Sequence, residues 1–343
     1  MTKRSIRIHL GTFAAILLST YSLVAQQYTI KFATLATEGS TWINVMNEYD
    51  QAIRRESGGR VGFKIYANGV QGDEKDVLRK IRLGQLHGAG ITGVGIGEIA
   101  KDVRILDAPF LFKSSDEVDS VSNQFHELFE KSFEDGGFVL LGWAEVGFVY
   151  IFTNSQVTTP AELKGVRMWM WEGDPIAEAL FSVVGVHPIP LSITDVMTSL
   201  QTKLIDGIYS PPFECIALQW FTRVKYMLDV PLADAQGAIV VSKSKFDQFP
   251  KDIQDILLNN GKTYFTKLTR MSREDNTKAV ETLKKNGIQM TSVTDKDLLA
   301  QYDEIGRKAR RMLIGKLYDE KLLNDAEAAV QVVRSKSATK KSK

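Results

Sequence analysis

Residues 28–66 read YTIKFATLATEGSTWINVMNEYDQAIRRESGGRVGFKIY. The first nine residues are rich in aromatic and β-branched side chains, a composition typical of a strand. A turn follows, and the spacing of Trp42, Met46, Tyr49 and Ile53 predicts a helix with one apolar face. Two glycines end this helix, and residues 61–66 alternate as a second strand. The order strand, helix, strand predicts an α/β fold with helices packed on a mostly parallel sheet.

The rest of the chain predicts a second lobe. A chain of 343 residues exceeds what one hydrophobic core usually fills, and a new cycle of strands and helices begins near residue 138. Residues 251–285 contain no proline and carry apolar or small residues three or four positions apart, which predicts one helix long enough to reach across both lobes. We expect lobe I to comprise residues 26–148 and about 232–272, and lobe II residues 149–231 and about 273–333.

Both ends of the chain are positively charged. Lys3, Arg4 and Arg7 precede an apolar run that ends at the small residue Ala25, so residues 1–25 are interpreted as a signal peptide for export to the periplasm. An uncleaved anchoring helix is the alternative. The last ten residues, 334–343, are rich in serine and lysine and are predicted to form a disordered basic tail. The body between these ends is net negative, so no nucleic-acid partner is expected.

The sequence contains no recognisable catalytic or metal-binding pattern. Cys215 is the only cysteine, which excludes an internal disulfide, and it is predicted to be a small buried apolar side chain. The histidines are isolated and no Gly-x-Ser-x-Gly segment occurs, so we predict no metal, no cofactor and no catalytic residues. The glycine pattern of residues 88–93 follows a predicted helix rather than a strand, which favours a strand end over a phosphate site.

Residues 163–171, LKGVRMWMW, form the most distinctive stretch of the second half. In a strand, Arg167, Trp169 and Trp171 lie on one face, with two methionines on the other. Two indole rings on one face make a large apolar wall. Periodicity alone leaves two interpretations open, a strand packed under helices and the wall of a ligand pocket.

Several segments, in the right order, resemble the substrate-binding subunits of TRAP transporters of the dicarboxylate-receptor type. The resemblance spans about residues 28–333, and the segments that carry it are Ser57–Val61, Tyr66–Glu74, Asp107–Phe112, Pro160–Gly165 and Leu200–Pro211. It implies a two-lobed α/β periplasmic solute-binding protein with a ligand cleft and a long helix bridging both lobes. It also implies lobe closure over a small molecule, delivery to the transporter's membrane subunits, and no catalysis. A helical-repeat periplasmic partner protein is compatible with the resemblance.

The chain departs from the family pattern where an organic acid is usually held. The position of the family's carboxylate-binding arginine holds Trp169, a second arginine position after Gly147-Phe148 holds Val149, and the usual asparagine before a proline is Ser210. An arginine guanidinium can bind a carboxylate through two hydrogen bonds, and none of these three side chains can do so. We therefore expect a hydrophobic or amphipathic organic ligand. The residues expected to bind it are Trp42, Gln71, Phe148, Val149, Arg167, Trp169, Trp171, Ile193, Tyr209 and Ser210.

Three alternatives stay open at this point. Arg167 shares a predicted strand face with Trp169, so an organic-acid receptor that uses Arg167 is one of them. The same binding fold can serve as the ligand-binding component of a sensor. An exported enzyme is the third, and it requires a nucleophile and a base brought together in the cleft.

Overall fold

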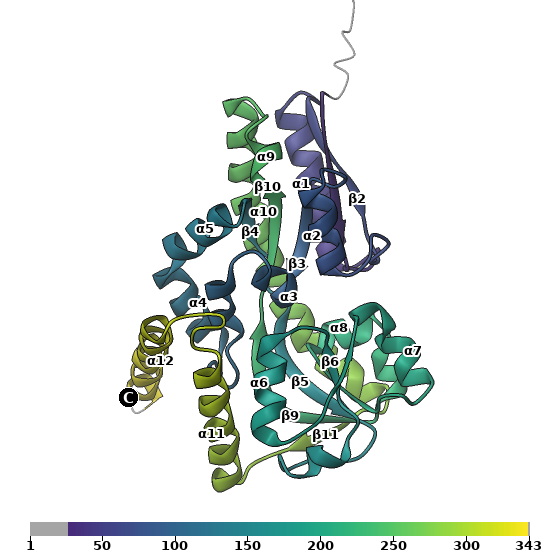
Figure 1. The fold of residues 1–343 in the computed structure, drawn as a ribbon, viewed down its shortest axis with the longest axis vertical. Coiled ribbons are helices and arrows are strands. Elements are labelled where there is room, and N and C mark those ends of the chain that lie inside the picture. The colour runs from purple at the N-terminus through teal and green to yellow at the C-terminus, as the bar shows by residue number, and fades with distance from the viewer. Residues whose placement is uncertain (1–26, 342–343) are drawn as a thin grey trace, which may run out of the picture.

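The computed structural model describes residues 27–341, and Figure 1 shows them as two lobes stacked along the long axis. Lobe I contains a five-stranded sheet in the order β2-β1-β3-β10-β4, and lobe II a four-stranded sheet in the order β11-β9-β5-β8. A small parallel pair, β6-β7, lies beside the second sheet. The strand bounds are β1 (Tyr28–Thr34), β2 (Val61–Tyr66), β3 (Gly88–Thr92), β4 (Phe138–Trp143), β5 (Gly147–Thr153), β6 (Trp169–Trp171), β7 (Ile189–Leu191), β8 (Gly207–Ser210), β9 (Tyr226–Ala235), β10 (Gly237–Ser242) and β11 (Gln289–Ser292).

Helices cover both sheets. The α-helices are α1 (Thr41–Glu56), α2 (Glu74–Arg82), α3 (Gly93–Gly97), α4 (Ser115–Gln124), α5 (His126–Asp135), α6 (Pro175–Val184), α7 (Val196–Gln201), α8 (Pro212–Ala217), α9 (Lys243–Phe246), α10 (Lys251–Lys285), α11 (Lys296–Met312) and α12 (Glu320–Lys341). Short 3-10 helices are η1 (Lys101–Asp107), η2 (Glu162–Gly165), η3 (Ile193–Asp195) and η4 (Trp220–Arg223).

The predicted first unit of strand, helix and strand is confirmed, because β1, α1 and β2 occupy that stretch and β1 pairs in parallel with β2. Both sheets are mixed, because β10 is antiparallel to β3 and β4 in lobe I and β5 is antiparallel to β8 and β9 in lobe II. The reason is the connectivity between the lobes. Strand β5 enters lobe II from lobe I and β9 returns towards lobe I, so two neighbouring strands run in opposite directions.

Among residues 27–341, four chain segments pass between the lobes, the last of them residues 313–319 between α11 and α12. The connection from β4 to β5 and the connection from β9 to β10 run side by side, and they are tied by hydrogen bonds from Ala144 N to Gly237 O (2.8 Å) and from Val146 N to Ala235 O (2.9 Å). The third segment is α10, which packs against α1 and β4 of lobe I and against α8 of lobe II. The prediction of one long bridging helix over residues 251–285 is therefore confirmed.

In the hydrophobic core of lobe I, α1 packs against β2 of the sheet and against α10, and α10 also contacts β4 directly. Tyr49 of α1 is fully buried; its hydroxyl donates to Leu257 O (3.0 Å), and its ring centroid lies 4.8 Å from that of Phe265. Both contacts are made with α10. The bridging helix is thus part of the lobe I core as well as a connection to lobe II.

The C-terminal helices change two predictions. Helix α11 packs on α6 of lobe II, but α12 packs on α4 of lobe I, so the assignment of the whole stretch 273–333 to lobe II is wrong at its end. The guanidinium of Arg334 on α12 binds the Glu117 carboxylate (2.9 and 3.0 Å) and Leu111 O (2.8 Å). The predicted disordered tail from residue 334 is also wrong as far as Lys341, because α12 continues to that residue.

The predicted signal peptide, residues 1–25, lies outside the described residues. Among the helices within residues 27–341, none has both the length and the apolar character required to cross a membrane. Cys215 is fully buried, as predicted. Residues 88–92 form β3, which confirms the interpretation of the glycine-rich segment as a strand end.

Candidate functional site

A cavity with about 780 Å³ of empty space, counting its opening to solvent, lies between the lobes. Lobe I contributes η1 and the junction of β3 with α3, and lobe II contributes β6, α6, α8 and part of β9. The polar and aromatic residues that line it include Arg104, Asp107, Trp169, Trp171, Asp174, Phe181, Tyr209, Ser210, Glu214 and Asp234.

One wall of the cavity is aromatic. Trp169 stacks on Tyr209, with ring centroids 4.9 Å apart and an interplanar angle of 18°, and meets the edge of Trp220 at 5.6 Å. The Trp169 indole N–H donates to Leu191 O (3.0 Å), and the Tyr209 hydroxyl accepts from Trp171 N (3.0 Å). Because their polar atoms already have partners, these rings present apolar surface to a ligand.

A second, smaller cavity adjoins the first. It lies between lobe I and α8, and Trp42 at the start of α1 lines it together with Leu35 and Phe213. Thr92, Val146 and Glu214 line both cavities, so the two cavities are neighbours that share part of their walls.

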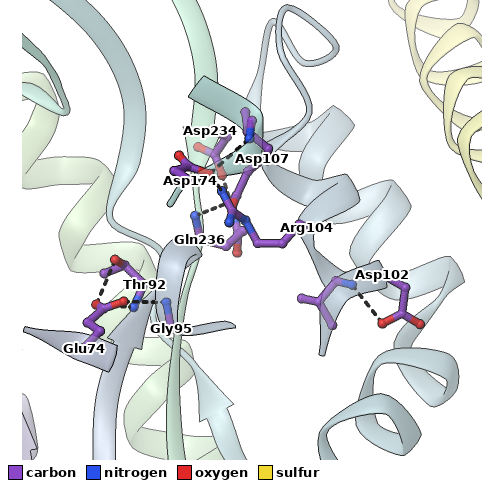
Figure 2. Close-up of polar contacts among 11 residues, drawn as sticks. Glu74, Thr92, Gly95, Asp102, Arg104, Asp107, Asp174, Asp234 and Gln236 are labelled. Carbon is purple, nitrogen blue, oxygen red and sulfur yellow. Dashed lines mark hydrogen bonds and ion pairs between the residues drawn. The ribbon is translucent and has the colours of Figure 1, made fainter. Parts of the chain in front are cut away.

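A buried glutamate, Glu74, lines the second cavity and binds the backbone of lobe I beside it. Both oxygens of Glu74 accept backbone hydrogen bonds, from Thr92 N (2.7 Å) and Gly95 N (2.7 Å), as Figure 2 shows. Burial raises the pKa of Glu74 to about 7, against the lowering effect of these hydrogen bonds. Glu74 thereby fixes the start of α3 against α2.

Arg104 is the buried cation of the first cavity, and it is paired on two sides. Its Nε donates to Asp107 (2.6 Å) and its Nη2 to Asp174 (3.0 Å), which belongs to lobe II (Figure 2). The two carboxylates raise the pKa of Arg104, against the opposing effect of burial. Burial raises the pKa of Asp107 to about 6, although Arg104 and the backbone N–H of Gln236 (2.9 Å) lower it.

Two further acidic residues line the cavity. The Ser210 hydroxyl donates to Glu214 (2.8 Å), and desolvation still raises the Glu214 pKa to about 7. Asp234, near the end of β9, accepts a hydrogen bond from Gln236 Nε2, and its other oxygen, Oδ1, is buried without a partner. Burial, with repulsion from Glu145 and Asp107, raises the pKa of Asp234 well above its usual value.

Asp73, the N-cap residue of α2, also links the two lobes by hydrogen bonds across the cleft. Its carboxylate accepts hydrogen bonds from three groups of lobe II: Trp171 Nε1 (3.1 Å), Ser192 Oγ (2.5 Å) and Ile193 N (3.3 Å). It also accepts from Glu74 N (2.6 Å) within its own lobe. One side chain therefore stabilises both a helix start and the contact between the lobes.

Most of the predicted ligand residues come together at the cleft. The first cavity is lined by Val149, Trp169, Trp171, Ile193, Tyr209 and Ser210, and the second by Trp42. The alternation that placed both tryptophans on one face therefore brings both of them to the cavity wall.

Three predicted residues do not line either cavity. Arg167 precedes the short strand β6, and its guanidinium binds Asp206 (2.6 Å) at an exposed position. The Gln71 side chain accepts from Lys80 Nζ (3.1 Å) in its own lobe. Phe148 points to the face of β5 opposite Val149 and packs against the hydrophobic core.

Sequence reasoning missed the polar residues of the site, Asp73, Arg104, Asp107, Asp174 and Asp234. Asp73 and Asp107 lie in segments that resemble the TRAP family, and this was the one available signal for them. The other three are ordinary charged residues in sequence, and they differ from the rest only in being buried at the cavity.

The family model of bacterial extracellular solute-binding protein family 7 matches residues 32–315. The chain belongs to this family. Its curated relatives include the 2,3-diketo-L-gulonate-binding periplasmic protein of Escherichia coli, 24% identical over 92% of this chain and 95% of that protein. The C4-dicarboxylate-binding periplasmic protein of Rhodobacter capsulatus is 22% identical over 84% of this chain and 86% of its own length.

Solved structures share the fold of this family 7 protein. A TRAP periplasmic solute-binding protein from Desulfovibrio salexigens with bound orotic acid superposes with a TM-score of 0.82 at 19% identity, covering 89% of this chain and 99% of the other. One from Roseobacter denitrificans with bound L-galactonate has a TM-score of 0.80 at 20% identity, with the same coverage. The two-lobed fold and the resemblance to TRAP receptors are confirmed.

The family defines the general activity. Its members are periplasmic receptors that bind small molecules and work with the membrane subunits of TRAP transporters, and they are not enzymes. The family 7 protein described here is accordingly a solute receptor for transport.

Proposed function

We propose that this periplasmic receptor, exported by its N-terminal signal peptide, binds a small hydrophobic or amphipathic organic molecule in the cleft between its lobes. The molecule is held by the aromatic wall of Trp169, Trp171 and Tyr209 and delivered by lobe closure to TRAP membrane subunits. The observation that carries the proposal is Trp169. It stacks on Tyr209 and lines the cavity at the position where the family resemblance expects a carboxylate-binding arginine.

The size of the apolar contribution follows from buried area. A ligand that buries about 200 Å² of apolar surface against such a wall gains about 5 kcal/mol, at about 25 cal/mol per Å². The sum is an upper value, because the ordering of ligand and lobes opposes binding. Apolar burial is therefore a large favourable contribution to the binding of such a ligand.

The cations nearest the cleft argue against a carboxylate clamp. Arg104 lines the cavity, but Asp107 and Asp174 already neutralise it. Arg167 is paired with Asp206, and it lies outside the lining of the cavity. A carboxylate ligand would therefore have to displace an existing ion pair to find a positive partner.

Receptors with this fold hold organic acids, including orotic acid and L-galactonate in the solved structures. The deciding experiment must therefore be able to detect both classes of ligand. Native mass spectrometry of the purified protein, followed by extraction and identification of the bound compound, meets this requirement.

The matched pair of variants is Trp169→Ala and Trp143→Ala. Trp143 packs against Phe129 and Phe133 in lobe I, away from the cavity lining. We expect an apolar or amphipathic compound in the wild-type protein and in the folded Trp143 variant, and its loss from the folded Trp169 variant, with circular dichroism as the folding check. Extraction of a sugar acid or a dicarboxylate from wild-type protein would refute the proposal.

A further inference from the structure

Asp234 is the one cavity-lining side chain among residues 27–341 with a buried polar atom that lacks a hydrogen-bond partner. The residue has no exposed surface, and its Oδ2 atom accepts from Gln236 Nε2 while Oδ1 accepts from nothing. Buried polar atoms are nearly always satisfied, because an unpaired one loses its hydration without compensation. Because Asp234 also lines the ligand cavity, a group on the ligand is a candidate partner for Oδ1.

The charges around Asp234 define what that partner should be. Asp107 raises the pKa of Asp234 by repulsion, and Figure 2 draws both residues together with Arg104 and Asp174. Arg104 is already paired with both of those carboxylates, so it is not available as a cation for Asp234.

The other nearby cation is also fully engaged. Arg273 of α10 binds Glu145 (2.5 Å) and Asp119 (2.6 Å), and each carboxylate receives more than one of its hydrogen bonds. Glu145 itself raises the pKa of Asp234 by repulsion. The acidic side chains at and behind the polar end of the cleft therefore outnumber the basic ones.

We propose that Asp234 determines specificity by pairing with a ligand that carries a protonated amine on an apolar body. The amine binds at Oδ1, and the apolar body lies against the aromatic wall. A cationic N–H donor would supply the missing hydrogen bond to Asp234 Oδ1, and its positive charge would offset the excess of acidic side chains. A ligand carboxylate would be repelled by the same groups. The inference rests on the proposed function, since it assigns the polar end of the same cleft.

The position of Asp234 connects this pairing to both lobes. It lies on β9 one residue before the strand ends, and the next connection carries Gln236, whose backbone N–H binds Asp107 of lobe I. An amine at Asp234 thus sits where the chain passes from lobe II to lobe I. Binding there stabilises the arrangement in which the two lobes meet.

Three probes of similar size test the assignment: 2-phenylethylamine, 2-phenylethanol and phenylacetate, which are cationic, neutral and anionic at pH 7. Their affinities are measured by isothermal titration calorimetry, with quenching of tryptophan fluorescence as a second readout. We expect the amine to bind at least about tenfold more tightly than phenylacetate, with the alcohol between them. This ranking is measured on wild-type protein, so it does not depend on the folding of a variant.

The variant Asp234→Asn keeps the shape of the side chain but cannot carry the negative charge that pairing with a cation requires. We expect it to lower amine affinity to about that of the alcohol, with alcohol affinity changed by less than about twofold. Asp206→Asn is the control, because Asp206 pairs with Arg167 outside the cavity lining.

The outcomes separate this inference from the proposed function. Phenylacetate as the tightest ligand, or an amine preference that survives in the Asp234 variant, refutes the role of Asp234. Equal affinities for all three probes also refute it and leave the apolar cleft standing. If none of the three probes binds wild-type protein, and that protein also contains no extractable compound, then both the role of Asp234 and the proposed function are refuted.

Discussion

Replacing Asp73 by serine should loosen the contact between the lobes without unwinding α2. Serine is also a good N-cap residue, so the helix start is retained, but its shorter side chain cannot reach Trp171, Ser192 and Ile193. Hydrogen bonds to a charged acceptor contribute about 1.5–3 kcal/mol each in mutational series, and water replaces part of this at a partly exposed site. We take about 2 kcal/mol for the loss of all three, which corresponds to about a 30-fold shift away from the closed arrangement.

Two measurements follow closure and binding separately. Small-angle X-ray scattering should show a larger radius of gyration for Asp73→Ser than for wild type, and calorimetry with 2-phenylethanol should show weaker binding by up to about 30-fold. Ser192→Ala, which removes one of the three bonds, should have a smaller effect in the same direction. An unchanged radius of gyration together with an affinity within about twofold of wild type would refute the role of Asp73 in holding the lobes together.

Three other predictions concern stability. Arg273→Met should lower the free energy of unfolding, measured by urea denaturation, by about 3 kcal/mol, because it leaves the buried Glu145 carboxylate without its cation. The control Arg270→Ala, at an exposed position of the same helix, should lower it by less than about 0.5 kcal/mol. Gly261→Ala should lower the free energy of unfolding by about 1–3 kcal/mol in the same assay. The added methyl would lie 2.3 Å from a backbone carbonyl of β4 and force α10 away from the sheet. A change near zero would contradict this packing. The raised pKa of Glu214, about 7, means that the folded protein holds more protons than the unfolded chain between pH 4.5 and 7. The free energy of unfolding should therefore fall as pH rises through this interval, and Glu214→Gln should make that fall smaller.

The site residues show where single-sequence reasoning succeeds. Trp169 and Trp171 were placed on one face by the alternation of a strand, and both line the cavity. The same alternation predicted that Arg167 would share this face. The strand starts only at Trp169, however, and the Arg167 guanidinium binds the carboxylate of Asp206, 39 positions away. Periodicity describes the direction of a side chain within an element and contains no information about which distant residue it meets.

The polar end of the cleft shows where such reasoning fails. Asp174 meets Arg104 across 70 positions of sequence, and Glu145 meets Arg273 across 128. Nothing in the local sequence of Asp234 distinguishes it from an exposed aspartate. Its significance comes from complete burial and a missing partner, and both are properties of the folded molecule.

The sequence by itself determined the α/β class, the two lobes, the helix from Lys251 to Lys285 and the placement of Trp169 and Trp171 on one strand face, because each depends on local periodicity, turn residues and chain length. Only the tertiary structure decided the antiparallel strands β10 and β5, the return of α12 to lobe I and the pairing of Arg104 at the cleft. These features depend on contacts between segments far apart in the chain. Packing and desolvation determine those contacts, and neither is encoded in any short stretch of residues.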